Sequence, residues 1–324
     1  MPVRAGVIGI GVHGLHHVRV LSEMEDVELS GIYDINQTVS KRVASQFGTI
    51  GYDTLEKLLN NVDCVTVAVP TLYHCDVVIE CLSKGKSVLV EKPIASHVAE
   101  ADRMITEAEK RRLVLSVGHI ERFNSAYRTI PSNNVSPVFI ESHRLSEFNP
   151  RGTDVAVVLD LMIHDIDIVL NMVKRPILTV NAIGVSVVSN EVDISNARLE
   201  FKGGCVANLT ASRISQRKMR KIRTFQKYSY ISMDFLSGES EVFTMNPDIR
   251  PVAQPGLVPQ LMDGIIYKKF TNDGLNALKL EISDFIQSVK HNSKPQVTGH
   301  DGRKALQVAS MVMESMEVSM RRIE

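Results

Sequence analysis

Two hydrophobic patterns follow each other along the chain and change over near residue 121. In the first part, short continuous apolar runs alternate with stretches whose apolar residues recur at helical spacing. Continuous runs are typical of parallel strands buried on both faces, and amphipathic stretches are typical of the helices that cover them. Strands are predicted at 4–10, 29–34, 64–69, 87–91 and 113–118, and helices at 38–47 and 97–111. This alternation predicts βαβ units in a doubly wound parallel sheet.

The second part contains longer strand-like segments with fewer helices between them. Strands are predicted at 138–148, 179–189, 194–201, 205–215 and 228–235, helices at 155–172, 274–290 and 301–322, and a loop at 247–259. Gly203 and Gly204 between two of these strands indicate a hairpin turn, and Asn272 or Asp273 would cap the helix at 274–290. We therefore expect an α/β dinucleotide-binding type of domain over 1–121. An α+β substrate-binding and oligomerisation domain with a large, mostly antiparallel open sheet is expected over 122–324.

Composition narrows the class of protein. The 324 residues suffice for two domains, and 37 basic against 37 acidic residues give no global charge that would attract nucleic acid or a membrane surface. The apolar runs are shorter than the roughly 20 residues that a membrane span needs, and the first residues lead directly into a strand without the flanks of a cleaved signal. The four cysteines show no CxxC spacing, which predicts reduced thiols in a cytoplasmic protein and suggests no metal site.

A glycine-rich loop follows the first predicted strand and opens a helix. Gly9, Gly11 and Gly14 form G-x-G-x-x-G in the context that a dinucleotide requires: a tight turn, close approach of a pyrophosphate, and close helix–strand packing. Asp34 ends the second strand about 20 residues later, where a carboxylate accepts ribose hydroxyls and repels a 2′-phosphate. This combination predicts NAD rather than NADP; the alternative is a glycine turn without a ligand. The predicted binding residues adjoining this loop and carboxylate are Val12, His13 and Ile35.

Charged residues also stand at the end of the fourth predicted strand, in "VEKPIA". Ligands of doubly wound sheets bind beyond the carboxyl ends of the strands, so Glu91 and Lys92 are expected at the cofactor edge. Pro93 restricts Lys92 to extended geometry, and a partly desolvated lysine can exchange a proton with a substrate hydroxyl. A surface salt bridge at a strand end is an equally good interpretation of these residues taken alone.

A second candidate for proton transfer lies in "VVLDLMIHDIDIVL". Asp160 and His164 are four residues apart, so on a helix they lie on one face, where the carboxylate can tune the imidazole. Asp165 and Asp167 fall off that face and are expected to cap, pair or face solvent. Taken alone, an Asp/His pair at this spacing is usually a surface hydrogen bond.

Together, G-x-G-x-x-G, "VEKP", "GHIERFN" (118–124) and "DLMIHDID" (160–167) resemble the Gfo/Idh/MocA family of sugar and cyclitol dehydrogenases over nearly the whole chain. The resemblance implies a Rossmann domain, an α/β domain with a large open sheet, and a catalytic group in which Lys92 polarises the hydroxyl, His164 is the acid/base and Asp160 orients it. It also implies that "VPTLYH" lies along the cofactor and that "GHIERFN" approaches nicotinamide and substrate. The residues so assigned are Val69, Pro70, Thr71, His74, His119 and Asn124.

The residues around these motifs resemble more closely one subgroup of the family. Its members oxidise the 3-hydroxyl of UDP-N-acetylglucosamine-type nucleotide sugars, and the products are precursors of lipid A or surface polysaccharide. Gly152 stands alone where a glycine pair is usual, and Met162 replaces a frequent glycine. Alternatives are an inositol or free-sugar dehydrogenase of the same family and a non-catalytic NAD-binding sensor or scaffold. The cations expected to meet a substrate diphosphate are Arg144, Arg213 and, less strongly, Arg151.

Two further expectations concern surfaces. The run of basic residues at 213–227 is interpreted first as a solvated hairpin and second as a site for an anionic partner; the absence of interleaved aromatic residues argues against nucleic acid. The open sheet is expected to pair with another subunit in a dimer or tetramer.

Overall fold

The computed structural model describes residues 2–130, 135–148, 155–246 and 265–321. The chain divides into two compact units. The first contains Met1–Phe123 and Leu275–Gln307, and the second contains Asn124–Gly274 and Val308–Glu324.

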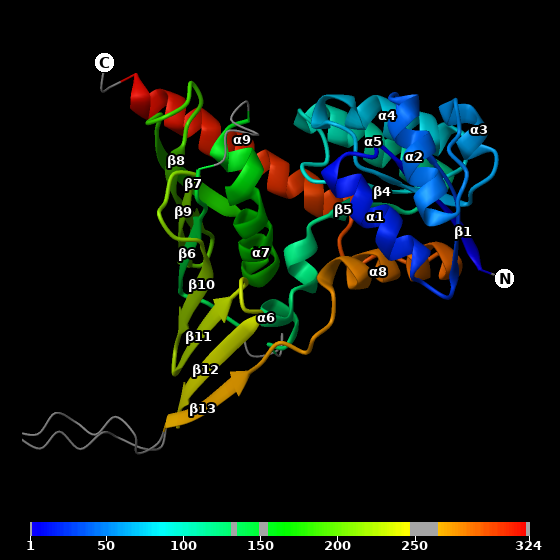
Figure 1. Ribbon diagram of the computed structural model, residues 1–324. Helices are drawn as coiled ribbons and strands as arrows, with labels where there is room; N and C mark the ends of the chain where they lie inside the picture. Colours follow the sequence, from blue (N-terminus) through cyan, green and yellow to red (C-terminus); the bar gives the residue numbers. More distant parts are fainter. Residues whose placement is uncertain (1, 131–134, 149–154, 247–264, 322–324) are drawn as a thin grey trace, which may run out of the picture. The chain divides into compact units, whose positions relative to one another are not determined.

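The first unit is built on a five-stranded, all-parallel sheet in the order β2-β1-β3-β4-β5. Figure 1 shows helices α1 and α8 on one side of this sheet and α4 and α5 on the other. The strands are β1 (Val3–Ile8), β2 (Val27–Tyr33), β3 (Cys64–Val67), β4 (Ser87–Glu91) and β5 (Leu115–Gly118). The helices are α1 (Val12–Ser22), α2 (Gln37–Phe47), α3 (Leu55–Leu59), η1 (Thr71–Tyr73), α4 (His74–Ser83), α5 (Val98–Arg111), η2 (Ile120–Phe123) and α8 (Ala277–His291). The predicted doubly wound sheet is confirmed.

The continuous apolar runs predicted as strands are buried on both faces of this sheet. In β4, Val88, Leu89 and Val90 are fully buried, as expected where helices cover both faces. Burial of this kind contributes about 1.5–3 kcal/mol for each large aliphatic side chain. The run ends where the polar Glu91 and Lys92 begin, so the hydrophobic pattern itself sets the point at which β4 delivers charged side chains to the sheet edge.

The expected first domain, 1–121, corresponds to Met1–Phe123, but residues 275–307, which were expected in the second domain, belong to the first unit. Helix α8 carries Ile282, Phe285 and Ile286 into the same hydrophobic core as the buried residues of α1 and β1. Beyond α8, Ser116 of β5 bridges to Thr298. The segment 275–307 therefore belongs to the first unit because it packs with the sheet of that unit, although it is far from that sheet in the sequence. The helix cap also differs from the expectation, because Asn276 accepts the N–H groups of the first turn of α8.

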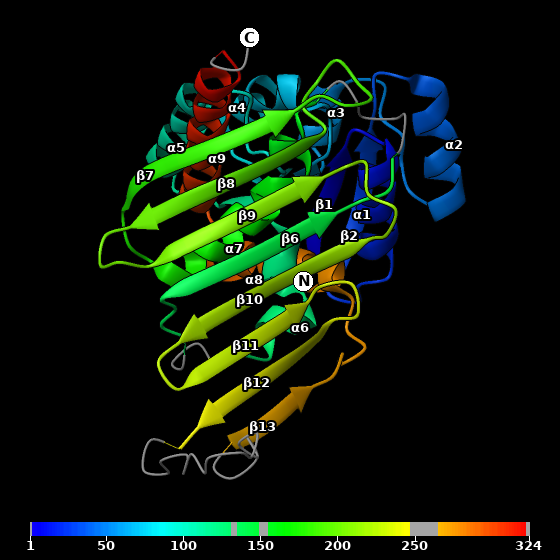
Figure 2. The same cartoon turned by 90° about the vertical axis from the view of Figure 1, so that its left-hand side faces the viewer.

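The second unit contains an eight-stranded sheet in the order β13-β12-β11-β10-β6-β9-β8-β7 (Figure 2). Neighbouring strands are antiparallel except for the parallel pair β6 and β9, which confirms a mostly antiparallel sheet. The strands are β6 (Phe139–Leu145), β7 (Ile177–Val185), β8 (Ile194–Phe201), β9 (Val206–Ser212), β10 (Met219–Gln226), β11 (Ser229–Asp234), β12 (Glu239–Met245) and β13 (Ile265–Phe270). The helical segments are α6 (Ser125–Arg128), η4 (Val158–Met162), α7 (Ile163–Val173) and the last part of α9 (Gly299–Met320).

The two faces of the eight-stranded sheet differ. Alternate residues such as Ile140, Ile222 and Ile231 are fully or almost fully buried on the side of α7. On the other face, five aromatic rings from five neighbouring strands form a ladder with centroids 4.8–5.7 Å apart. These rings belong to Phe139, Phe225, Tyr230, Phe243 and Tyr267. In Figure 2, no helix of the second unit's described residues covers this face.

The hairpin turn predicted in the second unit is present. Gly203 and Gly204 do turn between β8 and β9, both with positive φ. The predicted loop at 247–259 lies outside the described residues. Across the described ranges, no helix is both long and apolar enough to cross a bilayer, and no group of three His, Cys, Asp or Glu side chains is placed to hold a metal ion.

Candidate active site

The glycine loop joins β1 to α1 in the geometry that a pyrophosphate requires. Gly9 has φ +84°, and a Cβ on Gly14 would lie 1.8 Å from the carbonyl oxygen of Gly9, so both positions demand glycine. A Cβ on Gly11, in contrast, would meet nothing within 4 Å. Gly11 is also the N-cap of α1 and provides no side-chain cap for the first-turn N–H groups. The loop therefore leaves open space in front of a positively polarised helix end.

The carboxylate of Asp34 closes the other end of this loop. Its Oδ2 accepts the N–H of Ile10 at 2.7 Å, and its Oδ1 accepts the N–H of Asn36 at 2.7 Å. Each carboxylate oxygen has a second acceptor position, so a pair of ribose hydroxyls can still bind. The two hydrogen bonds hold the carboxylate in one orientation, beside the loop that would carry the phosphates.

Exposed apolar side chains surround this edge of the sheet. Val12 is 71 % exposed, Ile35 is 87 % exposed and Leu72 is 69 % exposed. Val69, Pro70 and Thr71 follow β3 at the same carboxyl edge and are half-buried or exposed. A flat ring and a ribose would cover such side chains. Together with the open space at Gly11 and the oriented Asp34, this chemistry fits a dinucleotide.

Lys92 follows β4 directly, and the peptide bond between Lys92 and Pro93 is cis. The N–H of Lys92 donates to Glu91 Oε2 at 3.2 Å, and Glu91 Oε1 lies 3.0 Å from Nε2 of the buried His17. Burial would raise the pKa of Glu91, but the hydrogen bond with His17 and nearby positive charge outweigh it and hold that pKa below its usual value. Glu91 is therefore an anion that ties the lysine's backbone to α1.

His74 has a different place from the one expected. Its side chain is 1 % exposed. Its Nδ1 lies 2.9 Å from the carbonyl oxygen of Pro93 and its Nε2 lies 2.9 Å from that of Val69. Both ring nitrogens of His74 therefore face backbone carbonyls of the first unit, so the ring is engaged within the protein rather than presented to a cofactor. The sequence motif located the correct segment but could not show which way the ring points.

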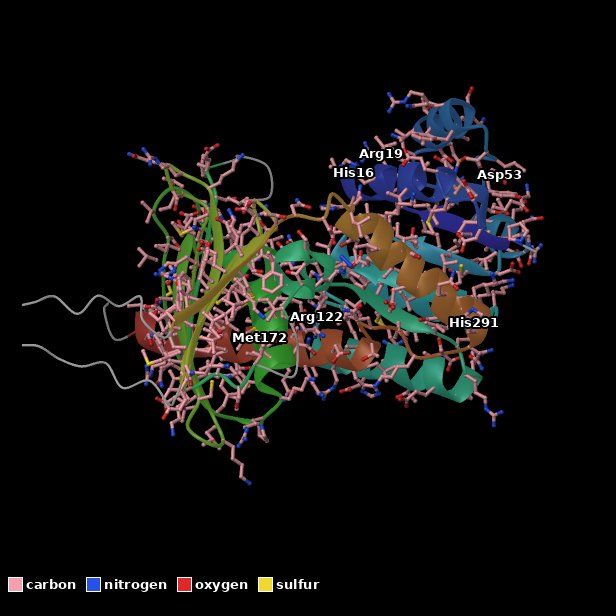
Figure 3. All side chains as sticks on the ribbon, turned by 90° about the horizontal axis from the view of Figure 1, so that it is seen from below. His16, Arg19, Asp53, Arg122, Met172 and His291 are labelled. Atoms are coloured by element: carbon pink, nitrogen blue, oxygen red, sulfur yellow. The ribbon has the colours of Figure 1, made fainter. Side chains whose placement is uncertain are left out.

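His13 is exposed in the first turn of α1, and His16 of the same helix is exposed as well (Figure 3). His17, which was not predicted as a site residue, is the histidine of α1 that contacts Glu91 at the end of β4. Its position one helical turn after Gly14, on the sheet side of α1, is the signal that could have identified it.

The segment that follows β5 brings His119 and Asn124 into buried or half-buried positions. His119 is 1 % exposed, and its N–H donates to the carbonyl oxygen of Val117 at 2.8 Å. Asn124 Oδ1 accepts the N–H of Ala126 and Asn124 Nδ2 donates to the carbonyl oxygen of Phe235, both at 3.0 Å. The amide of Asn124 thus caps α6 and joins this helix to the end of β11. These two hydrogen bonds give Asn124 a structural role.

Asp160 and His164 lie where the helix changes its winding. Residues Val158–Met162 form a π-helical turn, and the α-helix begins at Ile163. Asp160 is therefore inside the wider turn, whereas His164 is in the first turn of α7, and both are half-buried. Single π-turns of this kind are uncommon and frequent at functional sites, which distinguishes this pair from an ordinary surface Asp/His pair.

Two arginines expected to bind a diphosphate are committed to the fold instead. Arg144 is 2 % exposed, and its Nε and Nη2 donate to Asp165 Oδ1 at 2.9 and 2.6 Å. Arg213 is 5 % exposed and donates to the backbone carbonyl of Val155. In this arrangement neither guanidinium is exposed to a diphosphate, and a sequence shows a charge but not its partner. Arg151 lies outside the described residues.

The basic run at 213–227 contains the strand β10. Several cations of this run lie close to acidic residues of neighbouring segments. Lys221 lies 3.2 Å from Asp234, Arg223 lies 3.6 Å from Glu141, and Lys218 lies 3.7 Å from Glu147. Charges at alternate positions and buried Ile222 and Thr224 between them describe a strand with one solvated face. These ion pairs support the interpretation as a solvated hairpin.

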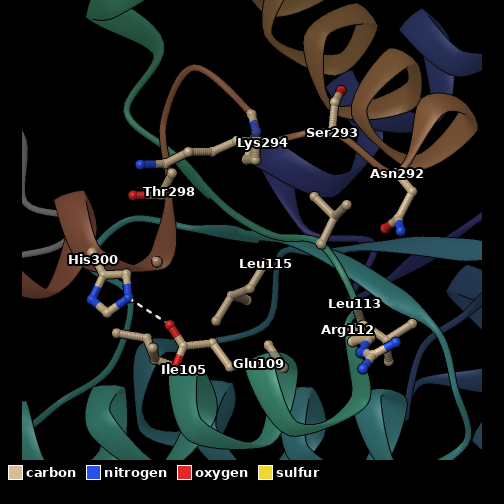
Figure 4. A pocket seen from close by; sticks show the side chains of 14 residues that line it. Ile105, Glu109, Arg112, Leu113, Leu115, Asn292, Ser293, Lys294, Thr298 and His300 are labelled. Carbon is tan, nitrogen blue, oxygen red and sulfur yellow. Dashed lines mark hydrogen bonds and ion pairs between the residues drawn. The ribbon is translucent and has the colours of Figure 1, made fainter.

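A pocket of about 410 Å³ lies elsewhere in the first unit (Figure 4). It is lined by the end of α5, the start of β5 and the segment 292–300, including Arg112, Leu115, Lys294 and His300. His300 Nε2 lies 2.8 Å from Glu109 Oε1 at its rim. Because this pocket is at the amino end of β5, it is at the opposite edge of the sheet from Asp34 and Lys92 and does not belong to the candidate site.

Comparison with known proteins places this arrangement in a family. Residues 3–119 match the family model "Oxidoreductase family, NAD-binding Rossmann fold", and residues 116–226 match "GFO/IDH/MocA C-terminal domain". A UDP-N-acetylglucosamine 3-dehydrogenase of Acidithiobacillus ferrooxidans is 32 % identical, with 99 % of each chain covered. A myo-inositol 2-dehydrogenase of Thermotoga maritima is 27 % identical, with 97 % of this chain and 96 % of that protein covered.

Solved structures agree with this result. A structure of the A. ferrooxidans enzyme matches with a TM-score of 0.89 and 30 % identity, covering 98 % of this chain and 99 % of that one. A myo-inositol 2-dehydrogenase structure from Lactobacillus plantarum, at 18 % identity and a TM-score of 0.80, shows the same fold. The glycine loop, the carboxylate after β2 and the two sheets thus occur in the combination that defines one group of enzymes, and the chain belongs to the Gfo/Idh/MocA family of NAD-binding oxidoreductases.

Proposed function

We propose that this protein oxidises the 3-hydroxyl of UDP-N-acetylglucosamine with NAD and releases the 3-keto nucleotide sugar. The observation that carries the proposal is the similarity, over 99 % of both chains, to an enzyme with this activity. Lys92, Asp160 and His164 support it, because they provide the acid/base groups that oxidation of a secondary alcohol requires.

In the proposed reaction the C3–H and O3–H bonds break and a C3=O bond forms. Bound NAD supplies the chemistry of a hydride acceptor, and the hydroxyl proton passes to the protein. Lys92 polarises the hydroxyl oxygen with its ammonium group, His164 takes the proton, and Asp160 orients the imidazole and stabilises its charged form. Gly9, Gly11 and Gly14 would hold the pyrophosphate, and Asp34 would hold the ribose diol. The neighbouring residues would be Val12, His13, Ile35, Val69, Pro70, Thr71 and His119. A 3-keto sugar is the substrate class that an aminotransferase accepts.

A UDP-sugar brings a diphosphate whose charges need cations or helix N-termini. Arg144 and Arg213 are unsuited to this role because they are buried in contacts with Asp165 and Val155. Arg151, in the segment that precedes the catalytic helix, is the candidate that we keep. Replacing it with methionine should raise KM for the UDP-sugar and leave NAD affinity unchanged.

The test is a panel of UDP-sugars, free sugars and inositols, each assayed with NAD by the absorbance of NADH. UDP-N-acetylglucosamine should have the highest kcat/KM, free N-acetylglucosamine should react far more slowly, and UDP should compete. Equal turnover of myo-inositol would assign the chain to the inositol dehydrogenases of the family. NAD binding without turnover of any substrate would indicate a sensor or scaffold.

We further propose that the protein is a cytoplasmic homo-oligomer that pairs through the aromatic-ladder face of its large sheet. Four rings of the ladder are half-buried and Tyr267 is 49 % exposed, and a row of aromatic rings on an open sheet favours burial against a second copy. All four cysteines are free and buried, as suits a reducing compartment. Light scattering should give the mass of a dimer or tetramer, and Phe243→Glu should shift it toward the monomer; a monomeric wild-type protein would contradict this proposal.

A further inference from the structure

The backbone that carries Lys92 has little support from the sheet. The ladder between β3 and β4 ends at Val90, and the ladder between β4 and β5 ends at Glu91. Lys92 and Pro93 follow beyond the last ladder pair. Side-chain contacts can therefore help to fix the position of this turn.

We infer that His17 and His74 are positioning residues that hold the Lys92–Pro93 turn from two sides, His17 through Glu91 and His74 through the carbonyl of Pro93. This inference rests on the proposed role of Lys92 in the reaction. It assigns a function to two buried histidines that the proton-transfer group itself does not use.

The first hold comes from α1. His17 is 1 % exposed, and its Nε2 lies 3.0 Å from Glu91 Oε1. The other oxygen of Glu91 accepts the N–H of Lys92 at 3.2 Å. A Cβ on Gly118 would lie 3.1 Å from that same oxygen, so the end of β5 passes close to the carboxylate. Glu91 is thereby fixed between two strands and a helix, with the lysine's backbone hydrogen-bonded to it.

The second hold comes from the first residue of α4. His74 spans two segments, because Nδ1 lies 2.9 Å from the carbonyl oxygen of Pro93 and Nε2 lies 2.9 Å from that of Val69. Val69 belongs to the segment expected to lie along the cofactor. The ring thus sets the spacing between that segment and the lysine turn.

Two carbonyl oxygens facing one imidazole constrain its protons. A neutral ring has a single N–H and can donate to only one of them, whereas an imidazolium donates to both. Burial lowers the pKa of His74, while both carbonyls and the negative charge of Glu91 act in the opposite direction. In either protonation state, at least one N–H of His74 joins the ring to one of these two segments.

Precise placement matters for a group that exchanges a proton with a bound alcohol. A misplacement of about 1 Å can cost on the order of 10²-fold in rate, and replacing residues that orient a catalytic group typically costs about 10- to 100-fold. If the histidines served only to stabilise the fold, their loss would lower the melting temperature without a specific effect on the chemistry of Lys92.

Substitution of His74 with asparagine or glutamine tests its two contacts one at a time. An asparagine amide can occupy the place of Nδ1 and keep the hydrogen bond to Pro93, and a glutamine amide can occupy the place of Nε2 and keep the one to Val69. By the same reasoning, His17→Gln keeps a donor to Glu91, whereas His17→Leu removes it. His291→Gln, at an exposed histidine that ends α8, is the matched control (Figure 3).

The experiment measures kcat, KM, NAD affinity by calorimetry, and the rate at which an amine-reactive reagent modifies Lys92, followed by mass spectrometry of its peptide. His74→Gln and His17→Leu should lower kcat about 10- to 100-fold and change the modification rate of Lys92, with NAD affinity and KM nearly unchanged. His74→Asn and His17→Gln should restore most of kcat, and the control should match the wild type. In a Lys92→Met background, His74→Gln should cause no further loss.

Two results would overturn the inference: unchanged Lys92 modification in folded His74→Gln and His17→Leu variants, or losses that add fully to that of Lys92→Met. A wild-type protein that oxidises no sugar would refute the proposed function separately. The modification rates would still decide whether the histidines position Lys92, because that readout does not depend on turnover.

Discussion

Arg144 and Asp165 form a buried ion pair, with Nη2 and Oδ1 2.6 Å apart and both side chains at most 4 % exposed. The hydroxyl of Ser142 donates to the other carboxylate oxygen at 2.7 Å. Arg144 and Ser142 belong to β6 and Asp165 belongs to α7, so the pair joins the sheet to the helix that begins beside Asp160. This arginine stabilises the second unit and does not present a free charge to a substrate.

Removing one partner of this pair should therefore destabilise the protein. Arg144→Met leaves the charge of Asp165 buried without its partner, and such changes cost about 3–5 kcal/mol. The free energy of unfolding in urea should fall by this amount, and the double variant Arg144→Met/Asp165→Leu should recover part of it. An Arg144→Met protein with unchanged stability and a raised KM for the UDP-sugar would show that Arg144 binds the diphosphate after all.

Asp34 should determine the choice of cofactor. The wild type should bind NAD well and NADP poorly, because the oriented carboxylate accepts the ribose hydroxyls and repels a 2′-phosphate. Asp34→Asn should weaken NAD binding about tenfold or more, since hydrogen bonds to a charged group contribute about 1.5–3 kcal/mol each, and should narrow the preference over NADP. Calorimetry with both cofactors measures this, and tighter binding of NADP by the wild type would refute the assignment.

Lys92 should be essential for turnover but not for cofactor binding. Lys92→Met should lower kcat by about 10²–10⁴-fold, the contribution usual for a positioned acid/base, and leave the affinity for NAD unchanged. Lys84→Met, which removes an exposed lysine paired with Glu56, is the control. If Lys92→Met were about as active as the wild type, the "VEKPIA" segment would be only a strand end with a salt bridge, without a catalytic lysine.

Asp193 should make the second unit sensitive to acid. Burial would raise the pKa of Asp193, but the hydroxyl of Ser189 and the N–H groups of Val187, Val188 and Ser189 hold it well below its ordinary value. A depressed pKa in the folded state stabilises the protein above the unfolded-state pKa, and this contribution is lost as the pH falls toward the folded-state pKa. Unfolding followed from pH 7 into the acid range should show less loss of stability in Asp193→Asn than in the wild type; parallel curves would contradict this account.

The first sheet and the glycine loop could be predicted because their signals are local. The buried run at 87–91 ends at Glu91, and the structure ends β4 at that residue. The glycine spacing predicted a tight turn at Gly9 and close packing at Gly14, and the structure has a positive φ at Gly9 and a close approach of Gly14 to Gly9. Such features depend on a few neighbouring residues and are visible in any single sequence.

Features that depend on distant partners could not be predicted. The strand β10 was not recognised because its charged residues obscured the alternation of Ile222 and Thr224, and β12 and β13 were not recognised either. The return of α8 to the first unit depends on packing with residues far away in sequence. The roles of His17 and His74 likewise follow from their partners, Glu91 and two backbone carbonyls, which the sequence pattern does not pair with them.

The most direct test of the central claim follows the hydrogen atom at C3. UDP-N-acetylglucosamine deuterated at C3 should react with NAD to give deuterated NADH, detected by mass spectrometry, together with a 3-keto sugar that has lost the label. Substrate deuterated at C4 should give unlabelled NADH. If NADH formed while the sugar product kept its C3 deuterium, or if the deuterium at C4 appeared in NADH, oxidation at the 3-hydroxyl would be contradicted.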